Sequence, residues 1–220
     1  MTNSSTAPTT VQIYGPSFSS FVRSVMLICE QHQIGYTTGF AIDGDEFTLG
    51  SAQHLALHPY AKMPVLKHNQ VILPETASIC RYLVNTFASE ANNQLSVVQQ
   101  AIIDSFCSLA TIYLNQAIMR DYVLEFAFPK GDNGEVRLDK AKAAQPAVIA
   151  ALQVIDNELA NGEALNNDTF SIADALIAPQ LYYLSSLPGE FNVLDSVPAV
   201  KAYFNQLMTL SICQKILVPK

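Results

Sequence analysis

The chain has 220 residues, of which 50% are apolar and 14% are charged. That length accommodates one large domain or two small ones, and the composition is neither disordered nor fibrous. The 12 lysines and arginines against 19 acidic residues give a net charge of −7, which argues against a partner with a phosphate backbone or an anionic membrane surface. Nucleic acid is therefore not an expected partner.

Signals for membrane insertion or export are not evident in the sequence. Residues 1–10 have neither a basic region nor an apolar stretch and are predicted to form a disordered tail. No run approaches the ~18 uninterrupted apolar residues of a spanning helix. The four cysteines are far apart and show no metal-ligand spacing, which predicts buried reduced thiols. We expect a cytoplasmic, metal-free protein with no membrane association.

Between residues 11 and 87, short apolar runs alternate with helical patterns. Val22, Val25, Met26 and Cys29 recur at the spacing of one helix face, and Gly35 is predicted to close that helix. The predicted order is strand 11–14, this helix, strand 36–42, helix 52–57, strands 65–67 and 71–73, and helix 76–87. A βαβαββα order with a right-handed crossover and a closing hairpin predicts a thioredoxin-like domain over 11–87. The acidic turn at 43–46 lacks the later ligands of a calcium loop and is predicted to be solvated.

Residues 88–94 are small and polar and are predicted to be an interdomain linker. From 95 to 220 the pattern predicts an all-helical domain, with helices near 95–127, 138–159, 172–187 and 198–210. Ser171 and Asp174 form a variant of the capping box at the start of the third of these helices, which we interpret as structural only.

Three short segments could carry chemistry, although each alone has an ordinary structural explanation. Ser17-Phe18-Ser19-Ser20 precedes the first helix, where serines commonly cap amide groups but where a hydroxyl and the helix dipole can also hold an anion. Met63-Pro64 enters a predicted strand, where a trans proline is the usual case. Glu75-Thr76 begins a helix, where both residues are favourable in any case.

The sequence does not support a metal site or a redox-active cysteine. His54 and His58 are four residues apart and could share a helix face, but no carboxylate intervenes as in HExxH and no third ligand is apparent. Cys29 lies near the end of the predicted first helix, far from the N-terminus that would activate a thiol. Neither a metal site nor a redox cysteine is predicted.

In this order the motifs resemble the cytosolic glutathione transferase superfamily, and most closely the serine-type phi and related bacterial classes. The resemblance covers nearly the whole chain after the tail. It is carried by Ile13-Tyr14-Gly15 through Val25, by His58-Pro59-Tyr60-Ala61-Lys62-Met63-Pro64-Val65-Leu66, by Glu75-Thr76-Ala77-Ser78-Ile79 and by Phe170-Ser171-Ile172-Ala173-Asp174.

The resemblance implies a catalytic hydroxyl near the start of the first helix. When Arg23 is matched to the basic residue of that helix, Ser19 takes the catalytic place, with Ser17 and Ser20 as rivals. A tyrosine-type enzyme would use Tyr14 on the first strand instead. A cysteine-type relative would need a thiol around Ser19, and the sequence has none there.

The resemblance also implies a role for each residue that would bind glutathione. Met63 would present its backbone to the cysteinyl part, with Pro64 in a cis peptide, and Lys62 would lie near a carboxylate of the tripeptide. Glu75 and Thr76 would hold the γ-glutamyl end. The phi pattern has a histidine about ten residues before the position of Pro59, where this chain has Leu49. This departure affects the contact with the glycyl carboxylate and favours low affinity for glutathione.

The function implied is conjugation of the glutathione thiolate to a small hydrophobic electrophile, as in detoxification, by a C2 homodimer. The electrophile would lie between the first domain and the first long helix of the second. Phe106, Tyr113 and Arg120 have the spacing for lining it, but the same spacing serves core packing. Two alternatives stay open, a non-catalytic interaction module and a glutathione-dependent lyase, isomerase or peroxidase on the same fold.

Overall fold

The structure is a computed structural model that describes residues 10–88, 95–165 and 169–219. The chain divides between Gln94 and Leu95 into two compact units. The predicted tail (1–10) and linker (88–94) lie almost entirely outside the described residues.

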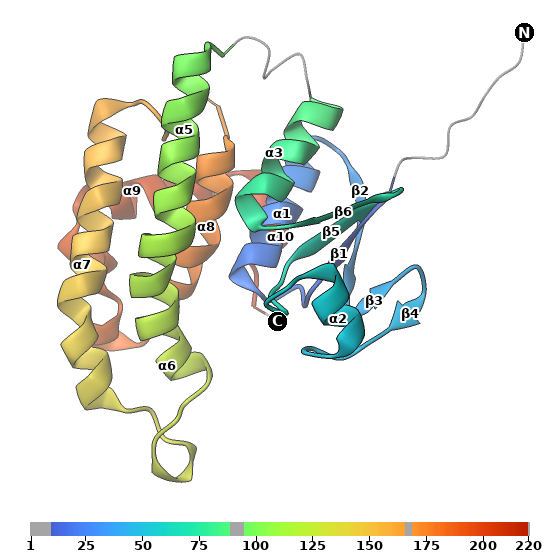
Figure 1. Cartoon of the computed structure of the whole chain (residues 1–220). Helices are drawn as coiled ribbons and strands as arrows, with labels where there is room; N and C mark the ends of the chain where they lie inside the picture. Colours follow the sequence, from blue (N-terminus) through green and yellow to red (C-terminus); the bar gives the residue numbers. More distant parts are fainter. Residues whose placement is uncertain (1–9, 89–94, 166–168, 220) are drawn as a thin grey trace, which may run out of the picture. The chain divides into compact units, whose positions relative to one another are not determined.

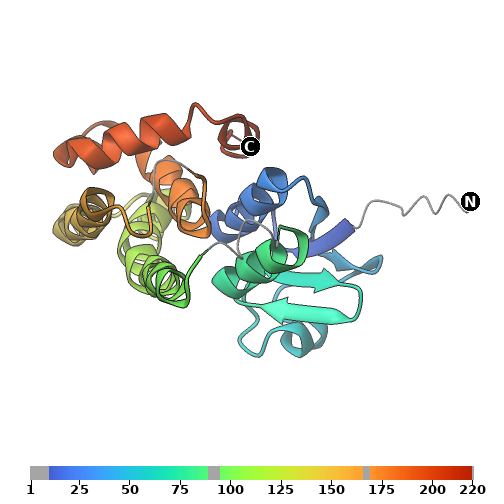
Figure 2. The ribbon, with the colours of Figure 1, turned by 90° about the horizontal axis from the view of Figure 1, so that it is seen from above.

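The first unit is built on a four-stranded mixed sheet. Its strands are β1 (Thr10–Tyr14), β2 (Gly35–Gly39), β5 (Val65–His68) and β6 (Val71–Pro74). The spatial order is β2-β1-β5-β6, with β1 and β2 parallel and the other neighbouring pairs antiparallel. Helices α1 (Ser20–Gln31) and α3 (Thr76–Phe87) cover one face, and α2 (Ala52–Leu57) lies on the other (Figures 1 and 2). The predicted thioredoxin-like arrangement is confirmed.

The predicted strand 36–42 is wrong in one respect, because it is two strands. The first ends at Gly39, whose φ of 149° lies outside the strand region, and Phe40 separates it from β3 (Ala41–Ile42). The latter pairs with β4 (Asp45–Glu46) in a small hairpin that turns through Asp43 and Gly44, both at positive φ. Glycine and aspartate tolerate this conformation, so the acidic segment makes a tight turn.

Two further details differ from the prediction. Helix α1 ends at Gln31, and Gly35 is the first residue of β2 instead of the residue that closes the helix. Asp43 is exposed but not merely solvated, because its carboxylate pairs with Lys67 and accepts a hydrogen bond of 3.0 Å from the amide of Gln12. The predicted turn thus ties the β3–β4 hairpin to the main sheet.

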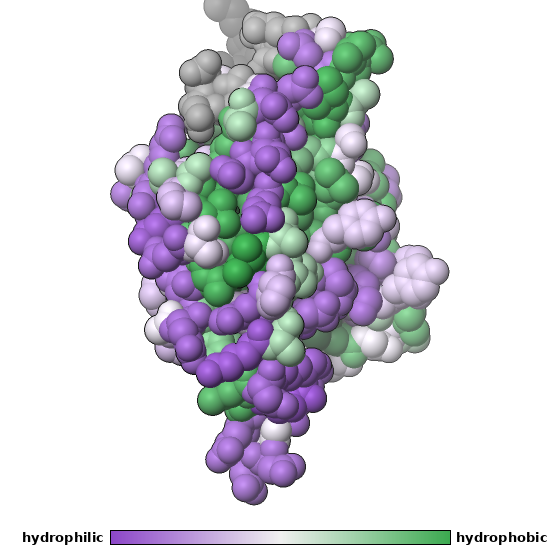
Figure 3. Space-filling view, turned by 90° about the vertical axis from the view of Figure 1, so that its left-hand side faces the viewer, coloured by the Kyte–Doolittle hydropathy of each residue, from purple (hydrophilic) through white to green (hydrophobic). Residues whose placement is uncertain are grey.

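The second unit is helical, as predicted. Its longer helices are α5 (Val97–Leu109), α7 (Leu138–Asn161), α8 (Ile172–Ser185) and α9 (Pro198–Leu207), followed by the short α10 (Ser211–Ile216), which the sequence analysis did not predict. The face of this unit drawn in Figure 3 carries polar side chains around a central apolar area, and its lower end is polar.

The predicted helix 95–127 is one continuous helical stretch, but it is not an α-helix throughout. After α5 the chain forms two π-helical segments, η1 (Ala110–Leu114) and η2 (Gln116–Val123), before the short α6 (Leu124–Ala127). By length and composition this stretch could also cross a membrane. One such helix is weak evidence for a membrane span, and only 22% of its most apolar part is buried within the protein. Cys107, Leu114 and Tyr122 are among the buried residues of the whole stretch.

The start of α8 is held by the predicted capping box. The Ser171 hydroxyl accepts a hydrogen bond from the Asp174 amide at 3.3 Å, and the Asp174 carboxylate accepts one from the Ser171 amide at 2.7 Å. Tyr203 of α9 also donates its hydroxyl to Asp174 at 2.5 Å. Burial raises the pKa of Asp174. The pattern joins α8 to α9, which confirms its structural interpretation.

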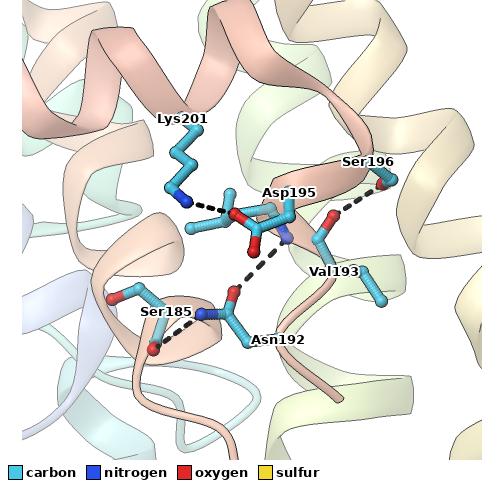
Figure 4. Close-up of polar contacts among 7 residues, drawn as sticks. Ser185, Asn192, Val193, Asp195, Ser196 and Lys201 are labelled. Carbon is cyan, nitrogen blue, oxygen red and sulfur yellow. Dashed lines mark hydrogen bonds and ion pairs between the residues drawn. The ribbon is translucent and has the colours of Figure 1, made fainter. Parts of the chain in front are cut away.

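The loop between α8 and α9 is held by local polar contacts (Figure 4). The Asn192 amide donates to the Ser185 carbonyl at 3.2 Å, and the Asn192 carbonyl accepts from the Leu194 amide at 3.3 Å. Lys201 in α9 forms an ion pair with Asp195. These contacts fix a segment that contains the short 3-10 helices η4 (Gly189–Phe191) and η5 (Val193–Ser196).

A buried ion pair joins α6 to the start of α7. Glu125 is 5% exposed, and Arg137 donates to its two carboxylate oxygens from Nε at 2.8 Å and from Nη2 at 2.6 Å. These hydrogen bonds from Arg137 lower the pKa of Glu125 to about 2. A bidentate pair of this kind fixes both geometry and charge.

We expect Glu125→Gln to lower the free energy of unfolding at neutral pH by about 1–3 kcal/mol, because it removes a charged acceptor from this pair. A glutamate ordinarily titrates near pH ~4.3. Because the folded pKa is depressed, the stabilisation is fully present above that pH and is lost as the pH falls toward 2.

Urea unfolding of the wild type and the variant between pH 7 and pH 3 measures this loss. Glu135→Gln changes an exposed carboxylate in the neighbouring turn and is the matched control. A difference between wild type and Glu125→Gln that did not shrink between pH 5 and pH 3 would contradict the assignment.

Candidate functional site

The predicted site residues of the first unit lie close together where the ends of three neighbouring strands meet, at one end of its sheet. Tyr14 pairs with Val65, and Val65 pairs with Pro74, so these three residues form one row across β1, β5 and β6. The residues next to this row on the same side are Gly15, Pro64 and Glu75. Neighbouring strands lie ~4.8 Å apart. The loop before α1, the Met63-Pro64 bond and the start of α3 are therefore neighbours.

Ser19 is the N-cap of α1, but it does not act as an ordinary cap. In the described part of the chain its hydroxyl accepts no hydrogen bond from the amides of α1. Ser51, Ser96 and Ser171, which cap other helices, all accept such a bond. Within the described residues, α1 therefore begins with amides that its N-cap side chain does not satisfy, and such groups are suited to an acceptor from outside the helix.

The rival hydroxyl groups are placed differently. Ser17 lies in the loop, where its carbonyl accepts a hydrogen bond of 3.2 Å from Nε of the buried Arg23. Ser20 is already the first residue of α1. Tyr14 is fully buried, and its hydroxyl donates to the Phe47 carbonyl at 2.9 Å. Tyr14 is thus committed to the core, which removes the tyrosine-type alternative.

The Met63-Pro64 peptide is cis, in agreement with the resemblance. The loop after β1 lies directly against Met63. A Cβ atom added to Gly15 would lie 3.2 Å from Met63 Cβ and 2.7 Å from Val22 Cγ2. Gly15 also has a φ of 140° and donates its amide to the Gly39 carbonyl at 2.7 Å. Only glycine allows this close approach without strain.

A fully buried histidine holds the segment before Met63. The Nδ1 atom of His54 accepts a hydrogen bond from the Gly50 amide at 3.1 Å, so the neutral ring carries its proton on Nε2. Nε2 lies 3.0 Å from the Lys62 carbonyl, to which it donates. His54 thus links the segment that contains Leu49 to the segment that contains Met63.

Glu75 lies at the start of α3 with a φ of 71°, an uncommon conformation for a residue with a side chain. Its side chain is 74% exposed, whereas Thr76 beside it is buried. One carboxylate oxygen lies 3.5 Å from Nε2 of His58. Backbone strain of this kind costs about 1–3 kcal/mol and is frequent at functional sites.

The other predicted residues differ in their surroundings. Lys62 is exposed, and only its backbone carbonyl is engaged with His54. Leu49 is 48% exposed in the loop before α2. Phe106 belongs to the buried core of the second unit, whereas Tyr113 and Arg120 are exposed. The last three residues therefore do not share one environment within their unit.

Sequence reasoning missed the roles of His54 in α2 and of His58 at its C-cap. Their spacing suggested a metal pair, but within the described residues no group of three His, Cys, Asp or Glu is arranged to hold a metal ion. Each ring instead contacts a backbone amide and one predicted site residue. The only signal in the sequence is their position just before Lys62-Met63-Pro64. The four cysteines are buried and form no disulfide in the described part of the chain, and burial raises the pKa of Cys29 to about 12.

The two glycines that pair beside the site provide a test of the close approach to Met63. We expect Gly15→Ala to lower the free energy of unfolding by more than ~1 kcal/mol, because it combines a strained φ with a clash. Gly39→Ala is the matched control, because its φ is also positive but its Cβ would meet nothing within 4 Å. Urea unfolding and the methyl NMR signal of Met63 measure both effects.

The conclusion about Gly15 would be wrong if both variants lost the same stability. It would also be wrong if the Met63 methyl signal moved equally in Gly15→Ala and Gly39→Ala.

Comparison with known families gives matches over most of the chain. Residues 13–91 match the family model described as glutathione S-transferase, N-terminal domain. Residues 74–210 match the model described as glutathione S-transferase, C-terminal domain.

Similar proteins and structures agree with these matches. The chain is 26% identical to glutathione S-transferase F12 of Arabidopsis thaliana, over 94% of this chain and 97% of the relative. The crystal structure of poplar glutathione transferase F2 is 19% identical, covers 94% of this chain and 97% of that chain, and gives a TM-score of 0.78. The structure of a theta-class glutathione S-transferase from Xanthomonas axonopodis pv. citri with glutathione bound is 21% identical, covers 97% of this chain and 99% of that chain, and also gives a TM-score of 0.78. A maize glutathione S-transferase I in complex with an atrazine glutathione conjugate also gives 0.78 at 20% identity, with 96% of this chain and 97% of that chain covered.

The two domain models are matched in chain order, on a thioredoxin-like unit and on the helical unit that follows it. The chain belongs to the glutathione S-transferase family.

Proposed function

We propose that this protein is a glutathione transferase in which the hydroxyl of Ser19 donates a hydrogen bond to the thiolate of bound glutathione. Glutathione is the co-substrate of the family to which the chain belongs. The observation that carries the role of Ser19 is that this serine occupies the N-cap of α1 but its hydroxyl accepts no hydrogen bond from the helix amides. A hydroxyl left uncommitted beside exposed helix amides is suited to an anion.

The magnitudes are sufficient for activation of a thiol. A free thiol with a pKa near ~8.5 is only a few per cent ionised at neutral pH. Lowering that pKa by ~2 units requires about 2.7 kcal/mol of preference for the thiolate. A hydrogen bond to a charged sulfur contributes ~1.5–3 kcal/mol. The helix N-terminus contributes a further ~0.3–1 kcal/mol. No general base is needed, and the serine is not the nucleophile.

The rest of the tripeptide would lie along the same edge of the sheet. Met63, beside the cis Pro64, would present its backbone to the cysteinyl part, as strand residues recognise extended peptides. Glu75 and Thr76 would hold the γ-glutamyl end at the start of α3. Lys62 is exposed beside this segment and would pair with a carboxylate of glutathione. Leu49 offers no polar partner to the glycyl carboxylate, which favours low affinity.

The second substrate would be a small hydrophobic electrophile, consistent with a role in detoxification. The uncommitted Ser19 hydroxyl favours this reaction over a non-catalytic interaction module, which would not need it. A lyase, isomerase or peroxidase reaction could use the same thiolate, since a fold does not fix a reaction. Four buried cysteines that form no disulfide within the described residues support a cytoplasmic location, and a net charge of −7 supports neither nucleic acid nor a membrane as a partner.

A homodimer would explain the exposed apolar side chains on the first helical stretch of the second unit. Val98 and Leu109 lie about three turns apart, on one side of the helix. Ile112 and Tyr113 follow and are 58% and 65% exposed. Apolar side chains gathered on one side of a helix commonly mark a contact surface.

The hydroxyl of Ser19 is tested by its removal. We expect Ser19→Ala to lower kcat/KM for conjugation of glutathione to a chlorodinitroarene by about 10- to 100-fold, because the thiolate loses a charge-assisted hydrogen bond. The pH at which the rate reaches half its plateau should rise toward the ~8.5 of a free thiol. Ser17→Ala and Ser20→Ala are matched controls on either side and should retain most of the activity.

Wild-type activity in Ser19→Ala, with an unchanged pH profile, would remove Ser19 from this role. A comparable loss in Ser17→Ala or Ser20→Ala instead would assign the role to that serine. Absence of conjugation and of binding to immobilised glutathione in the wild type would favour the interaction module.

The dimer is tested separately by a charge on the exposed helix face. We expect Ile112→Glu to reduce the mass measured by light scattering from that of two chains to that of one, because a buried unpaired charge is unfavourable at an interface. Val154→Glu places the same charge on a partly exposed apolar position of α7 and should leave the mass unchanged. A wild type that is already a single chain would rule out the dimer.

A further inference from the structure

His58 is a buried histidine whose proton is assigned by its contacts. It is the C-cap of α2 and is 3% exposed. Its Nδ1 atom accepts a hydrogen bond from the Tyr60 amide at 3.1 Å. A ring nitrogen that accepts from an amide carries no proton, so the neutral ring of His58 carries its proton on Nε2.

This nitrogen lies near the carboxylate of Glu75 at the start of α3. Nε2 of His58 lies 3.5 Å from Oε1 of Glu75. The two side chains differ greatly in freedom, since the His58 side chain is 4% exposed and the Glu75 side chain 74%. An exposed glutamate has several rotamers open to it, and ordering them has an entropic cost. The buried ring is the fixed group that favours one of them.

A neutral donor suits a carboxylate that must bind a cation. A lysine or arginine in the place of His58 would cancel the charge of Glu75, whereas a neutral imidazole orients the carboxylate and leaves its charge available. Glutathione carries a single ammonium group, on its γ-glutamyl end. Glu75 is the exposed carboxylate at the sheet edge where Gly15, Pro64 and Glu75 meet.

We propose that His58 is a positioning residue for glutathione, whose Nε2–H holds the Glu75 carboxylate in the orientation that receives the γ-glutamyl ammonium. This assignment rests on the proposed function, in which Glu75 binds that end of the tripeptide. His58 does not touch the thiol and contributes no acid or base. Its effect is therefore on the binding of glutathione and not on the chemical step.

Two substitutions distinguish the contributions of the two ring nitrogens of His58. In His58→Asn the side-chain carbonyl can replace Nδ1 as the acceptor for Tyr60, but nothing replaces the Nε2–H. In His58→Gln the amide group can replace the Nε2–H toward Glu75. We expect His58→Asn to raise KM for glutathione roughly threefold to fivefold with kcat unchanged, the range of a partly exposed charged contact. His58→Gln should remain close to wild type.

A double-mutant cycle tests whether the effect passes through Glu75. In the Glu75→Gln background, His58→Asn should change KM for glutathione no further. His68→Gln is the matched control, because His68 is a buried histidine at the other end of β5 that contacts Tyr82 and Asn69. It should lower stability without changing KM for glutathione.

A merely structural role gives a different pattern. Equal losses in His58→Asn and His58→Gln, a fall in kcat, or an effect of His58→Asn that adds fully to that of Glu75→Gln would each overturn the proposal.

If the wild type fails to bind glutathione, the proposed function is wrong, and so is the role of His58 in binding glutathione. The contact between His58 and Glu75 is measured independently, by the ¹⁵N NMR signals of the His58 ring. A proton on Nε2, with a signal that moves in Glu75→Gln, supports the contact. A proton on Nδ1, or a signal that does not change in Glu75→Gln, contradicts it.

Discussion

The candidate site depends on a helix whose first amides are not satisfied by its own N-cap. An α-helix begins with four amide groups that lack partners inside the helix, and a serine at the N-cap normally accepts from one of them. Ser51, Ser96 and Ser171 do so in this chain, whereas Ser19 does not. In the described part of the chain, the positive end of α1 therefore lies beside a hydroxyl that is not used for capping, and the two together favour a bound anion more than either does alone.

The surrounding scaffold is built to bring main-chain groups close to that point. The register that aligns Tyr14, Val65 and Pro74 places the ends of three strands side by side. Gly15 lets the loop before α1 lie against Met63, and His54 holds the neighbouring Lys62 carbonyl. None of these contacts is catalytic. Their common effect is to fix backbone positions, which lowers the entropic cost of binding an extended peptide.

The sequence predicted those features that depend on local periodicity and turn chemistry, such as helices 52–57 and 76–87 and the hairpin that contains β5 and β6. It could not predict the π-helical segments between Ala110 and Val123, because their residues fit an ordinary helical pattern. Ser19 was identifiable as a cap, but whether its hydroxyl is used for capping depends on side-chain geometry. The spacing of His54 and His58 suggested a shared helix face, but α2 ends at Leu57 and His58 is its C-cap. The partners of the two histidines, Lys62 and Glu75, come from other segments.

The residue type at position 19 also restricts the chemistry that the first unit can support. A serine oxygen cannot form a mixed disulfide, so thiol–disulfide exchange would need another thiolate at this point. Cys29 lies further along the same helix, but it is fully buried and its pKa is raised to about 12. The sulfur anion at the start of α1 would then have to belong to glutathione itself. Under that constraint, attack of the glutathione thiolate on an external electrophile is the reaction that this arrangement favours.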